Sequence, residues 1–130
     1  MDEHTKKRVI IFEDNSHLRD SLYFLVNTSP DFECVAAYPD TRQALTNVRK
    51  INPDVIIMDI EMPVMNGIET TLYIKNKMNL GDKEPKIVAL TAHDPILFKA
   101  DYENVPFDNV VTKPYSAEKI KDIITSFFGS

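Results

Sequence analysis

The sequence predicts an α/β domain built on a doubly wound parallel sheet, and three features of the chain carry that prediction. Apolar runs of strand length alternate five times with segments in which apolar residues recur at helical spacing. The runs are apolar nearly throughout, which is typical of parallel strands that helices cover on both faces. With 130 residues, the chain has the size of one domain with a single core.

Each expected strand is a short apolar run bounded by polar or turn residues. The first run, "RVIIFED", ends in an acidic pair, and the third, "DVIIMD", ends in a single aspartate. In chain order, the five expected strands cover residues 8–14, 32–38, 54–59, 86–92 and 109–113.

The segments between these strands predict helices. Apolar residues repeat at helical spacing within 15–30 until Pro30 ends the pattern, and Thr41 is a plausible N-cap for a helix that reaches Ile51. A third helix is expected at 68–78, after the Asn66–Gly67 turn. The segment after Pro95 has only a weak helical pattern, whereas Ser116 caps a last helix that carries four inward-facing apolar residues: Ile120, Ile123, Ile124 and Phe127.

Five strand-then-helix units leave few topologies, because crossovers between parallel strands are right-handed. The expected fold is the flavodoxin-like (βα)5 sheet with strand order 2-1-3-4-5, in which function lies at the carboxyl ends of the strands. We divide the chain into a charged tail, 1–6, and the domain proper, 7–130.

Composition excludes several classes of function. The net charge is −5 without any basic block, so we expect no direct nucleic-acid contact by this domain. The apolar runs are far shorter than the roughly 20 residues of a membrane span, and the charged start of the chain is not a signal peptide. Cys34 is the only cysteine, which rules out an internal disulfide and a thiolate metal site. These features are consistent with a cytoplasmic protein.

Polar residues gather where the strands end. Strand one ends in Glu13 and Asp14, strand three in Asp59, strand four in Thr91 and strand five in Lys113. Clustered carboxylates raise one another's pKa unless a cation compensates, and oxygen ligands of this kind suit Mg²⁺. A cation, a lysine and a hydroxyl around one carboxylate can hold a transferring phosphoryl group, with the carboxylate as nucleophile.

Four stretches resemble one known family when they are taken together: "IIFEDN", "VIIMDIEMPVMNG", "IVALTAH" and "VVTKPY". In this order, at the ends of strands one, three, four and five, they resemble the receiver domain of bacterial two-component response regulators. The resemblance runs from about residue 7 to residue 128. It implies that Asp59 is phosphorylated by a partner sensor histidine kinase, or by a phosphotransfer protein.

The resemblance also implies roles for the surrounding residues. Asp14, Asp59 and the backbone carbonyl of Glu61 would ligate Mg²⁺, and Glu13 would help through water. Lys113 would hold a phosphoryl oxygen, while Thr91, followed by Ala92, would report the presence of the phosphoryl group. The remaining residues would shape the turn after the acceptor (Pro63 and Gly67), allow a cis peptide (Pro114), or modulate lifetime and switching (Glu61, His93 and Val110).

The function expected from this resemblance is a phosphorylation-activated signalling domain, with at most slow self-dephosphorylation. It would regulate an attached or partner output domain, such as a transcription factor. A homodimer is possible through the face formed by the segment after Pro95, the strand at 109–113 and the last helix.

Three alternatives remain open from the residues. A haloacid-dehalogenase-like phosphatase also uses an aspartyl-phosphate, and Asp59-Ile60-Glu61 has a hint of its motif, but its nucleophile strand normally comes first in the chain. A nucleotide-binding module would need a Gly-rich loop, whereas the chain has only three glycines. A non-phosphorylated interaction domain of the same fold would not need the intact site.

The chain departs from the family pattern in two places. Val110 stands where the family usually has an aromatic residue. The segment "NVPFDN" replaces a Gly-containing turn before strand five, and Pro106 cannot supply a positive φ. These changes concern the output face and leave the residues of the site unaltered.

Overall fold

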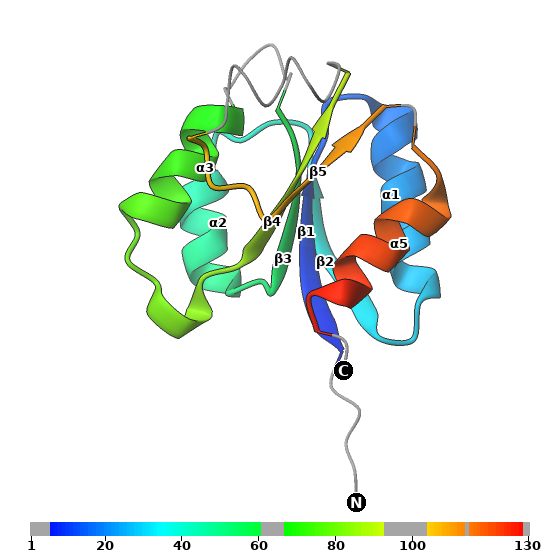
Figure 1. The fold of residues 1–130 in the computed structure, drawn as a ribbon, viewed down its shortest axis with the longest axis horizontal. Coiled ribbons are helices and arrows are strands. Elements are labelled where there is room, and N and C mark those ends of the chain that lie inside the picture. The colour runs from blue at the N-terminus through cyan, green and yellow to red at the C-terminus, as the bar shows by residue number, and fades with distance from the viewer. Residues whose placement is uncertain (1–5, 61–66, 93–103, 114, 129–130) are drawn as a thin grey trace, which may run out of the picture.

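A computed structural model gives the structure of the protein and describes residues 6–60, 67–92, 104–113 and 115–128. Strands and helices alternate along the chain except between the fourth and fifth strands, where part of the chain lies outside the described residues (Figure 1). In chain order they are β1 (Lys7–Phe12), α1 (Ser16–Thr28), β2 (Phe32–Tyr38), α2 (Ala44–Ile51), β3 (Val55–Asp59), α3 (Gly67–Asn76), the 3-10 turn η1 (Gly81–Lys83), β4 (Lys86–Thr91), β5 (Asn109–Thr112) and α5 (Ala117–Ser126).

The five strands form one parallel sheet in the order β2-β1-β3-β4-β5, which confirms the predicted flavodoxin-like topology. Helices α1 and α5 cover one face of the sheet, and α2 and α3 cover the other (Figure 1). The β1–β2 pairing shifts register between Val9 and Ile10, where the edge strand has an irregularity. In a sheet of this kind, the carboxyl ends of the strands meet at one edge.

The core divides into two layers, because successive side chains of a strand point to opposite faces of the sheet. Val9, Ile11, Val55 and Ile57 belong to the layer under α1 and α5, which we call the α1–α5 layer. Their neighbours in sequence, such as Ile10 and Ile56, belong to the layer under α2 and α3. This alternation also determines which face of the sheet the side chain of the residue that follows each strand points to.

Of the two expected helix caps, Ser116 is confirmed, and the structure adds a cap at Asn15 that the sequence analysis did not name. The side chain of Asn15 accepts a hydrogen bond from the Leu18 N–H at the start of α1, and Ser116 does the same for the Lys119 N–H in α5. These bonds satisfy N–H groups that have no partner within the helix.

The prediction that Thr41 caps the second helix is wrong. Helix α2 begins at Ala44, and Gln43 precedes it without a side-chain capping bond. The carbonyl of Thr41 accepts a hydrogen bond from the Ala44 N–H, so Thr41 closes a turn before the helix. Its side chain is only 3% exposed, and its hydroxyl has no hydrogen-bond partner among the described residues.

Some expectations fall outside the described part of the chain. These are most of the charged tail and the weak helix after Pro95. The first strand ends at Phe12, so Glu13 and Asp14 follow the strand instead of closing it. Among the described residues, no helix has the length and apolar character needed to cross a membrane.

Candidate functional site

Two buried carboxylates lie side by side at the carboxyl edge of the sheet. Asp59 is the last residue of β3 and is 1% exposed, and Glu13 directly follows β1 and is completely buried. Strands β1 and β3 pair in register up to Phe12 and Met58, so the next residue on each strand is one of these two acids. One carboxylate oxygen from each of Glu13, Asp14 and Asp59 lies within 4.8 Å of the other two.

The alternation of the strands explains why Glu13 and Asp59 meet. Glu13 continues the series Val9 and Ile11, and Asp59 continues Val55 and Ile57, all of which belong to the α1–α5 layer. Both acids therefore emerge on the same face of the sheet. Asp14, one residue further on, is exposed to solvent.

Lys113 is the cation of this cluster. Its Nζ lies 3.3 Å from Asp59 Oδ2 and 3.9 Å from Glu13 Oε1. The backbone N–H of Lys113 donates to the carbonyl of Thr91 at 2.7 Å, which fixes the lysine just beyond the paired ends of β4 and β5. One ammonium group faces two buried carboxyl groups, so ionisation of both would leave excess negative charge.

The Glu13 carboxylate shows the effect of that excess. Its Oε2 accepts a hydrogen bond from the Asn15 N–H at 3.1 Å, while Oε1 is buried without a hydrogen-bond partner among the described residues. Burial and the adjacent Asp59 carboxylate raise the pKa of Glu13 to about 8. An oxygen-only donor set with a buried, unsatisfied carboxylate oxygen fits a hard divalent cation such as Mg²⁺.

Arg19, which the sequence did not single out, holds the backbone of the acidic pair. Its Nη1 donates to the carbonyl of Glu13 at 2.9 Å and to the carbonyl of Asp14 at 3.4 Å. The guanidinium reaches back from the first half of α1 to the turn that precedes this helix. Nothing in the residue type or spacing signals such a contact, because it depends on how the turn between β1 and α1 folds.

Gly67 marks the closest approach of α3 to the end of β3. A Cβ at this position would lie 2.9 Å from Ile60 Cα, 3.0 Å from the carbonyl oxygen of Asp59 and 3.2 Å from Met58 Cγ. Real Cβ atoms essentially never approach backbone atoms this closely. Glycine therefore lets the helix lie directly against the backbone that carries Asp59.

The other predicted site residues are only partly described. Thr91 ends β4, fully buried, and Ala92 follows it at the surface. Val110 in β5 is half-buried and packs against the layer under α2 and α3. Four further residues lie outside the described residues: Glu61, Pro63, His93 and Pro114.

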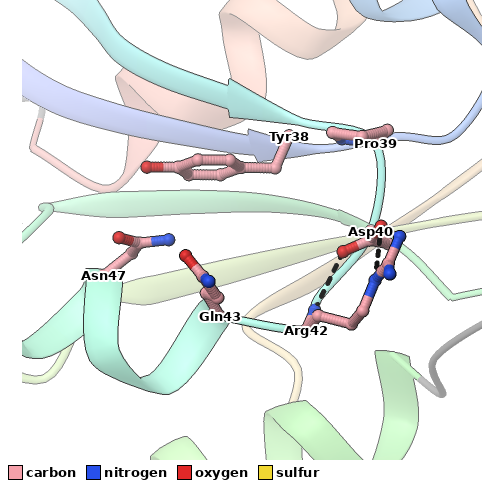
Figure 2. A pocket seen from close by; sticks show the side chains of 6 residues that line it. All are labelled: Tyr38, Pro39, Asp40, Arg42, Gln43 and Asn47. Carbon is pink, nitrogen blue, oxygen red and sulfur yellow. Dashed lines mark hydrogen bonds and ion pairs between the residues drawn. The ribbon is translucent and has the colours of Figure 1, made fainter.

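A separate polar hollow lies where β2 ends and α2 begins. Figure 2 shows the Tyr38 ring on one side and the Gln43 and Asn47 side chains on the other. Asp40 and Arg42 close one end through an ion pair at 2.7 Å, and the other wall residue is Pro39. The Tyr38 ring also stacks on the buried Phe12, so this wall of the hollow is formed by a side chain that packs against the core.

Curated relatives share part of their length with this chain. An uncharacterized response regulatory protein from Yersinia pestis is 30% identical over 118 residues, which cover 91% of this chain and 47% of the relative. The transcriptional regulatory protein DegU of Brevibacillus brevis is 35% identical over 89 residues, or 68% of this chain and 36% of DegU. A protein-glutamate methylesterase/protein-glutamine glutaminase of Dechloromonas aromatica is 39% identical over 64 residues, covering 49% of this chain and 18% of the relative. The chain thus spans less than half the length of these relatives.

Solved structures with the same fold cover nearly the whole chain. A DNA-binding response regulator of the LuxR family from Staphylococcus aureus has a TM-score of 0.80 at 30% identity, covering 95% of this chain and 99% of that chain. The chemotaxis response regulator CheY4 of Vibrio cholerae also has a TM-score of 0.80, at 25% identity, and covers 94% of this chain and 98% of that one.

The family model of the response regulator receiver domain matches residues 9–125, which include the acidic pair, Asp59, Thr91 and Lys113. This match extends over most of the chain and agrees with the strand order and with the relatives. The chain belongs to the response regulator receiver domain family of two-component signalling systems.

Proposed function

We propose that the protein is a phosphorylation-regulated receiver in which Asp59 accepts a phosphoryl group from a phosphohistidine of a partner kinase or phosphotransfer protein. The observation that carries this proposal is the position of Asp59 between Lys113, 3.3 Å away, and the carboxylates of Glu13 and Asp14. A buried aspartate that only stabilised the fold would not need two further acids beside it, because each acid raises the cost of charging the others.

The reaction follows from the donors and acceptors in place. A carboxylate oxygen of Asp59 attacks phosphorus, and an O–P bond forms as the N–P bond of the phosphoimidazole breaks. The bonding electron pair returns to the imidazole nitrogen, which takes up a proton. Lys113 binds a phosphoryl oxygen and offsets the charge that spreads over these oxygens during transfer.

The carboxylates are proposed to hold Mg²⁺, with Asp14 and Asp59 as direct ligands and Glu13 acting through water. When bound, the cation supplies the positive charge that three acids and one lysine lack. The family resemblance adds the backbone carbonyl of Glu61, which lies outside the described residues. These donors agree with the preference of Mg²⁺ for a few carboxylates together with water and phosphate oxygens.

Thr91, together with Ala92, is proposed to contact the phosphoryl group and thereby change the conformation of the surface beyond β4. Glu61 and His93 are proposed to set the lifetime of the acyl phosphate. The domain by itself is a signalling domain, and any output, including transcriptional control or an attached enzyme as in the relatives, would belong to another domain or protein. We place it in the cytoplasm, where a sensor histidine kinase presents its phosphohistidine.

Intact-mass measurement after incubation with acetyl phosphate tests the proposal. We expect one added phosphoryl group in the presence of MgCl2 and none in excess chelator, because the acid cluster needs the cation before it can approach an anionic donor. The Asp59→Asn variant should remain unlabelled under both conditions. Equal labelling of that variant, or continuous release of phosphate without any labelled protein, would contradict the assignment.

A further inference from the structure

Two buried oxygens near the site have no hydrogen-bond partner among the described residues. One is Glu13 Oε1, and the other is the hydroxyl of Tyr115. The first is a hydrogen-bond acceptor and the second can donate, so the two are chemically complementary. Buried polar groups in folded proteins are nearly always paired, directly or through an ordered water.

Both groups lie on the same face of the sheet. Tyr115 packs against the α1–α5 layer, which contains Val9 and Ile11, and Glu13 continues the alternation of these two residues. Lys113, two residues before Tyr115, already reaches Glu13 and Asp59. Burial and the charges of Glu13 and Asp59 raise the pKa of the Tyr115 phenol to about 12, so the hydroxyl keeps its proton at neutral pH.

A single hydrogen bond leaves the orientation of the Glu13 carboxyl group only partly determined. Its Oε2 is held by the Asn15 N–H at 3.1 Å, whereas Oε1 lies 3.9 Å from Lys113 Nζ, beyond hydrogen-bond length, and has no hydrogen-bond partner among the described residues. Under the proposed function, the ammonium of Lys113 binds a phosphoryl oxygen, and at 3.9 Å it makes no hydrogen bond to Glu13. The orientation of the Glu13 carboxylate then depends on another donor.

We propose that the Tyr115 hydroxyl is this donor: it positions Glu13 by a hydrogen bond passed through one ordered water to Oε1. The inference rests on the proposed function, because the purpose of holding Glu13 is to orient it toward the cation. A phenylalanine would fill the same space in the apolar layer, so the hydroxyl is the part of Tyr115 that packing does not explain. Groups that orient the residues around a metal commonly affect its affinity strongly when they are removed.

The first measurement is the affinity for Mg²⁺ of the whole chain, by calorimetric titration with MgCl2. Tyr115→Phe keeps the ring and removes the hydroxyl, and we expect its Kd to rise about ten-fold. Tyr73→Phe makes the same change at a surface tyrosine of α3 that is 43% exposed, and its Kd should stay at the wild-type value. A Tyr115→Phe Kd within two-fold of wild type overturns the proposal.

The second measurement tests whether the hydroxyl acts through Glu13, and it needs no metal. Denaturant unfolding in chelator is compared for wild type, Tyr115→Phe, Glu13→Gln and the double variant. We expect the change in midpoint caused by Tyr115→Phe to be different in the Glu13→Gln background, because groups that share a hydrogen-bond network are energetically coupled. The same change in both backgrounds overturns the proposal, even if the affinity for Mg²⁺ falls.

Labelling of the wild type with acetyl phosphate, performed alongside, separates this inference from the proposed function. Normal labelling of Asp59 combined with unchanged Mg²⁺ affinity in Tyr115→Phe would show that only the role of Tyr115 is wrong. A wild-type chain that neither binds Mg²⁺ nor becomes labelled would overturn the proposed function and this inference together.

Discussion

Gly67 shows how a residue outside the charged cluster can fix the position of Asp59, because it lies against the Asp59 backbone. Besides the charged groups of the site, the backbone of Asp59 and Ile60 lies in close contact with the first residue of α3. The φ of Gly67 is not in the left-handed region, so the reason for glycine here is space and not backbone freedom. The sequence predicted a turn at Asn66–Gly67 but gave no sign of this contact, because it depends on the docking of a helix on a strand.

We predict that Gly67→Ala lowers the free energy of unfolding by about 1–3 kcal/mol, the usual cost of overpacking a rigid contact. In an ordinary helix position the same change would raise stability by up to about 1 kcal/mol, so a loss identifies the contact. Labelling by acetyl phosphate should slow as Asp59 is displaced. Chemical denaturation and intact mass measure the two effects.

Gly81→Ala is the matched control. Gly81 has a φ of +59°, and a Cβ built there would have no neighbour within 4 Å, so alanine is strained by its backbone and makes no contact. We expect a stability loss of about 1–2 kcal/mol with labelling unchanged. If Gly67→Ala also left labelling unchanged, Gly67 would have no part in positioning Asp59.

At the level of residues, the sequence predicted which side chains form the site, but not the residues that hold their backbone in place. Glu13, Asp14, Asp59 and Lys113 come together as expected, because parallel strands end at one edge and alternation fixes the face. Their roles stay predictions. Arg19 was not predicted, because its partners are carbonyl groups whose direction only the folded turn determines.

At the scale of elements, Lys75 links α3 to residues that precede β4 and the edge strand β5. Its side chain is only 7% exposed, and its Nζ lies 2.7 Å from Asp108 Oδ2, 3.0 Å from Glu84 Oε2 and 3.0 Å from the carbonyl of Pro85. Asp108 Oδ2 also accepts the Ile87 N–H at 2.8 Å. One lysine thus joins the last turn of α3, the approach to β4 and the residue before β5.

We predict that Lys75→Met lowers the free energy of unfolding by about 1–3 kcal/mol, since it removes charge-assisted hydrogen bonds from a mostly buried group. The partners are themselves partly exposed, which keeps the loss below that of a fully buried pair. Lys77→Met removes a neighbouring exposed lysine and should change stability by less than about 0.5 kcal/mol. Equal effects of the two substitutions on chemical denaturation would show that the Lys75 contacts are not stabilising.

The sequence pattern that predicts the helices and strands does not predict the contacts of Lys75. A lysine at the end of a helical segment is ordinarily a solvated charge, and its three partners are separated from it by 9 to 33 positions in sequence. The turn before β5 lacks the glycine usual in the family, and none of the described residues 104–108 has a positive φ. The carboxylate of Asp108 makes the contacts that hold this turn to β4 and α3.

For the whole molecule, the order of the strands in the sheet was predictable from the sequence. Fully apolar strands, right-handed crossovers and a single core leave few arrangements for five strand-helix units, and the structure has the expected one. The cap prediction at Thr41 was wrong because Thr41 belongs to a turn, and the helix begins only after that turn, at Ala44. The residue type alone does not show where such a turn ends. Such turns depend on tertiary packing more than on local preference.

We predict that phosphorylation, or a beryllofluoride mimic, changes amide hydrogen exchange within residues 92–108 while Val110 keeps its rotamer. Val110 is β-branched and half-buried against the layer under α2 and α3, so flipping it would move little surface. The sequence of 92–108 has a weak helical pattern, and segments with weak packing open first. Residues 93–103 of this segment lie outside the described residues. Changes confined to β5 around Val110 would contradict this account.

If Asp59 carries the phosphoryl group as an acyl phosphate, chemical mapping will locate that group at this one residue. The protein is labelled with acetyl phosphate and MgCl2, reduced with borohydride, which converts an aspartyl phosphate to homoserine, and mapped by peptide mass spectrometry. We expect homoserine at position 59 alone, and none when MgCl2 is replaced by chelator. Homoserine at position 14 or elsewhere, or its absence from position 59 in protein that carries phosphate, would contradict the claim.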